Sequence, residues 1–84
     1  MSRSAHKQRL VEFLETIRRP EVPLDTFDER DGLVSSGLID SLALLQIIDF
    51  LEAEYGMDFS TTGVDPDQIS SIAEILDLIE RQTA

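Results

Sequence analysis

The sequence predicts an all-α protein: a small four-helix bundle with three longer helices, one short helix and a long loop between the first two. Three segments carry apolar residues at the i, i+3, i+4, i+7 spacing of a single helix face, and none alternates as a convincing strand does. The 84 residues are 42% hydrophobic. This composition fits one globular domain spanning residues 1–84, with a radius of gyration of about 12 Å.

The first helix is expected over residues 4–18. Arg18 and Arg19 complement the negative end of its dipole, and Pro20 cannot continue it. Its apolar face consists of Leu10, Phe13, Leu14 and Ile17.

Residues 20–40 form a connection that is long for a compact bundle. The segment contains Gly32 and Gly37 but also six large apolar residues, which should hold it against the helices. Because this loop ends at the start of a helix, that helix start is a natural place to look for function. The six apolar residues are Leu24, Phe27, Leu33, Val34, Leu38 and Ile39.

The second helix is expected from about Ser41 to Tyr55, and Gly56 can end it in a left-handed cap. Leu42 and Leu45 widen its apolar surface, so they either pack in the core or meet a partner. Its expected core stripe is Leu44, Ile47, Ile48, Leu51 and Tyr55.

Asp65 and Pro66 predict one short extra turn ending near Ile69, with the aspartate as N-cap and the proline at the first helical position. The last helix is expected over residues 72–81, opened by a capping box of Ser71 and Glu74. The inward residues of this helix are Ile72, Ile75, Leu76 and Ile79. The expected bundle core is Leu10, Leu14, Ile17, Leu44, Ile48, Leu51, Ile72 and Leu76.

Charge is distributed unevenly along the chain, whose formal net charge is −10. Residues 1–19 carry a net +3 and residues 20–80 a net −14. Such an acidic body repels nucleic acid and anionic membranes and attracts a partner with a basic patch, although acids also simply keep a small protein soluble. No apolar run approaches a bilayer span, so no membrane insertion is expected. The absence of cysteine excludes disulfides and thiolate metal sites and fits a cytoplasmic protein.

Two other groups of residues give little indication of chemistry. His6 is the only histidine and lies near a terminus expected to fray, so we expect a surface residue and no catalytic role. An acidic cluster in the loop contains Arg30 and does not fit the spacing of a calcium-binding loop, so no metal site is expected. Its members are Asp25, Asp28, Glu29 and Asp31.

Asp40 and Ser41 stand where the second helix should begin. Backbone amides at a helix start lack intrahelical partners, and the dipole adds partial positive charge there. A hydroxyl at the first helical position therefore suits attachment of a phosphate group, and Asp40 can cap a following amide. Serine and aspartate are also ordinary helix starters, so the pair alone is weak evidence.

The sequence resembles the acyl carrier protein superfamily over nearly its full length. The resemblance rests on GLIDSL (37–42), on the following helix LALLQIIDFLEAEYGMDF, on DPDQISSIAEIL, and on the order of the elements. It implies that Ser41, next to Asp40, receives a 4'-phosphopantetheine arm from coenzyme A. A separate phosphopantetheinyl transferase with Mg²⁺ attaches the arm, so the chain itself need not be an enzyme. The thiol of the arm holds acyl or aminoacyl groups as thioesters.

The resemblance also implies a docking surface on the second helix. Its partners would be the transferase, an adenylating acyl or aminoacyl ligase, and downstream transferases or synthases, and the carrier itself is expected to be a monomer. The implied docking residues are Leu42, Leu45, Gln46, Asp49 and Glu52. Core packing of the leucines and simple solvation of the acids remain alternative interpretations.

One departure from the family pattern bears on the pathway. Ala43 and Leu44 follow Leu42, where carriers of fatty-acid synthesis typically have an acid soon after the serine. The sequence looks more like free-standing carriers that are served by a dedicated adenylating ligase. The alternatives are a non-carrying helical protein-interaction module and a housekeeping fatty-acid-synthesis carrier.

Overall fold

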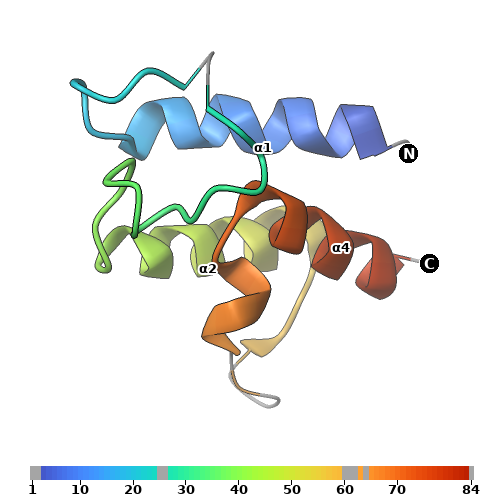
Figure 1. The fold of residues 1–84 in the computed structure, drawn as a ribbon. Coiled ribbons are helices and arrows are strands. Elements are labelled where there is room, and N and C mark those ends of the chain that lie inside the picture. The colour runs from blue at the N-terminus through green and yellow to red at the C-terminus, as the bar shows by residue number, and fades with distance from the viewer. Residues whose placement is uncertain (1–2, 25–26, 60–62, 64, 84) are drawn as a thin grey trace.

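The fold was analysed in a computed structural model, which describes residues 3–24, 27–59, 63 and 65–83. In these ranges the chain forms α-helices and a 3₁₀ helix and no β-strand, which confirms the all-α prediction (Figure 1). The elements are α1 (Arg3–Ile17), α2 (Ala43–Tyr55), η1 (Pro66–Ile69) and α4 (Ile72–Thr83). The radius of gyration of the Cα atoms is 12.0 Å, as chain length predicts.

Helices α1 and α2 lie antiparallel, as the direction of the ribbons in Figure 1 shows. Phe13 of α1 stacks on Phe50 of α2, with ring centroids 4.5 Å apart. Nearer the start of α1, His6 contacts Tyr55 in the last turn of α2. Helix α4 packs against both helices and follows η1 directly.

The core of the protein is centred differently on α2 than the sequence predicts. The buried residues of α2 are Ala43, Ile47 and Leu51, whereas the predicted core residues Leu44 and Ile48 are only partly buried. Ile17 of α1 is partly buried as well, and the remaining five predicted core residues are buried. The shift arises because the loop and η1 add buried side chains of their own: Leu24, Leu33, Leu38, Ile39 and Ile69.

The long connection between α1 and α2 is held onto the helices, as predicted from its apolar residues. Among those residues Phe27 is partly buried, and Val34 is an exception with 41% of its surface exposed. Backbone hydrogen bonds hold the loop in its middle and near its end: Leu33 N–H to Ser70 O, Ala73 N–H to Glu29 O, and Arg19 N–H to Leu38 O, each 2.8 Å.

Local sequence signals account for most helix ends. Asp65 accepts a hydrogen bond from the amide of Asp67 at the start of η1, as predicted. The hydroxyl of Ser71 accepts one from the amide of Glu74 at 3.2 Å, which is the serine half of the predicted capping box. Gly56 ends α2 in the left-handed conformation, with φ of 66°.

Candidate functional site

The candidate site is the turn that leads into α2. The α-helix begins at Ala43, two residues later than predicted, so Ser41 precedes the helix instead of opening it. The difference arises because residues 40–45 are joined by i→i+3 hydrogen bonds, the pattern of a tighter 3₁₀-type turn. These bonds run from Ala43 N–H to Asp40 O (3.1 Å), Leu44 N–H to Ser41 O (3.3 Å) and Leu45 N–H to Leu42 O (3.1 Å).

Asp40 stabilises this turn with its side chain. Its Oδ1 accepts a hydrogen bond of 2.9 Å from the amide of Ala43, the same amide that donates to the carbonyl of Asp40 at 3.1 Å, so this donor is shared between the side chain and the backbone of Asp40. The expectation that Asp40 caps a following amide is therefore met. Because the carboxylate is held against the backbone, the turn presents Ser41 and Leu42 in a fixed arrangement.

The hydroxyl of Ser41 is open to solvent. The residue is exposed, and its side chain makes no hydrogen bond to any residue that the structure describes. Within the same part of the chain, the amides of Ser41 and Leu42 also have no acceptor. An anion attached to the Ser41 oxygen would therefore find unused N–H donors in the turn and the positive end of the α2 dipole.

Exposed apolar side chains lie beside Ser41. Leu42 and Leu45 are 73% and 61% exposed, so the alternative that they pack in the core is wrong. Gln46 and Asp49 are exposed on the same side of α2. Glu52 is only partly exposed, because its Oε2 accepts a hydrogen bond of 3.2 Å from the amide of Phe59. The predicted docking residues thus form one stripe, with Glu52 at its less accessible end.

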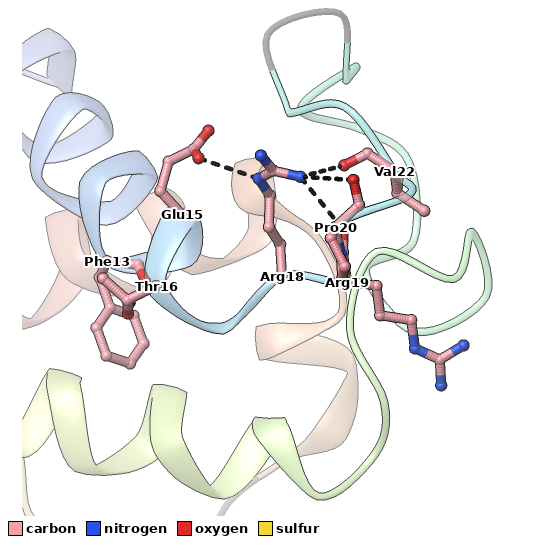
Figure 2. A network of polar contacts seen from close by, with 7 residues as sticks. All are labelled: Phe13, Glu15, Thr16, Arg18, Arg19, Pro20 and Val22. Atoms are coloured by element: carbon pink, nitrogen blue, oxygen red, sulfur yellow. Dashed lines mark hydrogen bonds and ion pairs between the residues drawn. The ribbon is translucent and has the colours of Figure 1, made fainter.

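The end of α1 helps to fix the loop that reaches Ser41. Figure 2 shows the guanidinium of Arg18, which binds Glu15 through Nε and three loop carbonyls through Nη1. The three carbonyls are Arg19 O (3.2 Å), Pro20 O (3.5 Å) and Val22 O (2.9 Å). The sequence predicted only a favourable charge here; the Arg-Arg-Pro run at the helix end was the available signal for these capping bonds.

His6 is not the surface residue that the sequence predicted. It is 4% exposed, and its Nδ1 lies 2.9 Å from the hydroxyl of Tyr55. Burial raises the pKa of that phenol. The pair joins the start of α1 to the end of α2, at the opposite end of α2 from Ser41, and is therefore structural with respect to the candidate site.

Two members of the acidic cluster of the loop, Asp28 and Glu29, are engaged by neighbouring groups. Glu29 forms a salt bridge of 2.9 Å with Lys7, which holds the pKa of the carboxyl below its usual range. Asp28 accepts a hydrogen bond from the amide of Arg30, and Asp25 lies outside the described residues. In the described ranges no three acidic or histidine side chains are grouped as metal ligands.

A surface hollow of about 550 Å³ lies between α4 and the segment that follows α2. Phe59, Gln68, Leu78 and Arg81 are among its lining residues, and none of the lining residues belongs to the turn at Ser41. The candidate site is therefore a position on the surface of the protein and not part of this hollow. Within the described residues, no helix is both long and apolar enough to cross a membrane.

Comparisons with known proteins identify no relative of this chain. No protein-family model matches it, and neither a curated protein nor a solved structure does so. The interpretation of the site consequently rests on its geometry and on the sequence motif around Ser41.

Proposed function

We propose that this protein is a carrier that holds acyl or aminoacyl groups as thioesters on a 4'-phosphopantetheine arm attached to Ser41. The observation that carries the proposal is the exposed Ser41 hydroxyl at the opening turn of α2, directly beside the exposed side chains of Leu42 and Leu45. The arm supplies a thiol to a chain that has no cysteine. In this proposal the fold is the four-helix bundle of the acyl carrier superfamily, with η1 as a short element before the last helix.

Attachment of the arm is a phosphoryl transfer carried out by a separate transferase with Mg²⁺. The Ser41 oxygen forms a bond to the phosphorus of coenzyme A that bears the pantetheine. The bond from that phosphorus to the adenosine bisphosphate half of coenzyme A breaks, and this half leaves with the bonding electrons. The proton of the hydroxyl passes to a base on the transferase, because the described residues place no base at the Ser41 side chain.

The turn before α2 suits the phosphodiester that results. The unpaired amides of Ser41 and Leu42 offer hydrogen bonds to its oxygens, and the helix dipole favours its charge. Asp40 does not compete for these amides, since its carboxylate accepts from Ala43. The residues present therefore fit the group that the sequence resemblance implies.

Partner enzymes would recognise the surface that surrounds the arm. Leu42 and Leu45 provide apolar contact area, and Asp49 provides charge on the same stripe of α2. Burying two exposed leucines in a partner removes apolar area from water, and the net −14 of residues 20–80 draws a basic partner towards it. The proposed partners are the phosphopantetheinyl transferase, an adenylating ligase and downstream transferases or synthases.

The same exposed leucines suit a second candidate function, a helical interaction module that carries no arm. The two functions are separated by incubating the protein with coenzyme A, Mg²⁺ and a broad-specificity transferase and measuring its intact mass. The carrier proposal expects a gain of one phosphopantetheine in the native protein and none in Ser41→Ala. Ser35→Ala, which alters another exposed serine, is the matched control and should be modified fully. No gain in the native protein, or a gain that survives Ser41→Ala, contradicts the carrier proposal.

A further inference from the structure

We propose that Arg19 is a positioning residue for the phosphate of the arm on Ser41, an inference that rests on the proposed function. The guanidinium would bind the phosphodiester oxygens and hold the root of the arm close to the loop. This role goes beyond attachment of the arm: Arg19, just after α1, would help to orient the arm that Ser41 carries just before α2.

The backbone of Arg19 is joined to the segment that delivers Ser41. Its N–H donates a hydrogen bond of 2.8 Å to the carbonyl of Leu38, three residues before Ser41. Leu38 and Ile39 are buried, and the amide of Ile39 bonds to Leu33 O, so this segment is anchored in the core. These main-chain contacts therefore hold the backbone of Arg19 next to the segment that leads to Ser41.

The side chain of Arg19 is available for a ligand. It is exposed, and Figure 2 shows it extending away from the guanidinium of Arg18, which is engaged with loop carbonyls. Within the described residues Arg19 forms no ion pair. The other arginine and lysine residues among residues 1–19 all form ion pairs with carboxylates: Arg3 with Asp77 and Glu80, Lys7 with Glu29, Arg9 with Glu54, and Arg18 with Glu15.

Charge makes an arginine without an ion pair significant when its backbone is bonded to the segment that leads to Ser41. The phosphodiester is a full negative charge placed next to Asp40 in a strongly acidic body, and the amides of the turn offer only partial positive charge. A guanidinium offers a full positive charge and two parallel N–H donors that match phosphate oxygens. Arg19 would therefore offset the repulsion that attachment of the arm introduces.

The inference is tested by NMR on the protein before and after attachment of the arm to Ser41. We expect the Nε–H resonance of Arg19 to move downfield on attachment, and the phosphorus-31 resonance of the arm to shift in Arg19→Gln. Arg30→Gln is the matched control: Arg30 is also exposed and unpaired within the described residues, but it neighbours Glu29, whose carbonyl binds α4. In Arg30→Gln, the phosphorus-31 resonance of the arm should equal that of the native protein. In Arg19→Lys, the phosphorus-31 resonance should lie between those of the native protein and Arg19→Gln, because lysine keeps the positive charge but lacks the two parallel N–H donors of the guanidinium.

Intact mass, measured first, separates the two ways of failing. If no arm is found on Ser41, the proposed function fails and the role of Arg19 fails with it. If the arm is attached in full but the phosphorus-31 resonance is the same in Arg19→Gln and the native protein, only the role of Arg19 is overturned.

Discussion

His6 of α1 and Tyr55 of α2 are hydrogen-bonded to each other: the imidazole Nδ1 of His6 lies 2.9 Å from the Tyr55 hydroxyl. The rings meet edge to face, with centroids 5.3 Å apart. Because His6 is 4% exposed, this hydrogen bond satisfies a polar group that has little access to water. It ties the first turns of α1 to the last turn of α2.

Removing the imidazole should destabilise the protein. We expect His6→Ala to lower the free energy of unfolding by about 1–3 kcal/mol, because it deletes buried contacts and leaves the Tyr55 hydroxyl without its partner. Urea denaturation followed by circular dichroism measures the loss. Gln8→Ala, at an exposed position on the same helix, is the control. A loss in His6→Ala no larger than in the control would show that the pair contributes nothing.

The phenol of Tyr55 should make stability fall at alkaline pH. Burial raises its pKa above the value of about 10 expected in the unfolded chain, so the folded protein favours the neutral form. This contribution is complete below pH ~10 and is lost as pH rises through the folded-state pKa. The free energy of unfolding, measured between pH 8 and 11, should therefore fall more steeply with rising pH for the native protein than for Tyr55→Phe. Equal slopes would contradict the assignment.

The cap at Asp40 should stabilise α2 independently of any arm. We expect Asp40→Ala to cost about 1 kcal/mol of unfolding free energy, because the amide of Ala43 loses its side-chain acceptor and keeps only the longer bond to the carbonyl of residue 40. Asp40→Asn keeps an acceptor oxygen and should recover most of that stability. Thermal or urea unfolding of the two variants provides the comparison, and equal losses in both would argue against a capping role.

Leu42 and Leu45 should matter for partners and not for folding. Because both side chains are largely exposed, Leu42→Ser and Leu45→Ser should change stability by no more than about 0.5 kcal/mol. Their rate of modification by the transferase should nevertheless fall. Ile47→Ala, on the buried face, is the contrasting variant and should cost about 2–5 kcal/mol. Unchanged modification rates in both leucine variants would exclude them from the docking surface.

Local features of the fold could be predicted from the sequence because their causes are local. The proline at the end of α1, Asp65 before η1, Ser71 before α4 and Gly56 after α2 each act within a few residues. The apolar loop residues likewise indicated that the connection is packed, since buried leucine and isoleucine offset the cost of ordering a long segment.

Features that depend on distant contacts could not be predicted. Burial of His6 requires Tyr55, 49 residues away, and the bonds of Arg18 require the path that the loop takes. The buried face of α2 includes the predicted Ile47, but it also includes Ala43 and leaves Leu44 and Ile48 only partly buried, because residues from the loop and η1 complete the core there. Periodicity showed that α2 has more apolar surface than one contact needs, but only packing decided which part stays exposed.

The attachment of an arm to Ser41 is tested most directly by peptide mapping of the protein purified from cells that naturally make it. Mass spectrometry of the peptide containing Ser41 should show a phosphopantetheine group, alone or with its thioester cargo, on that serine and on no other. Native protein that is functional with an unmodified Ser41 peptide, or that carries the group on another residue, would contradict the proposed function.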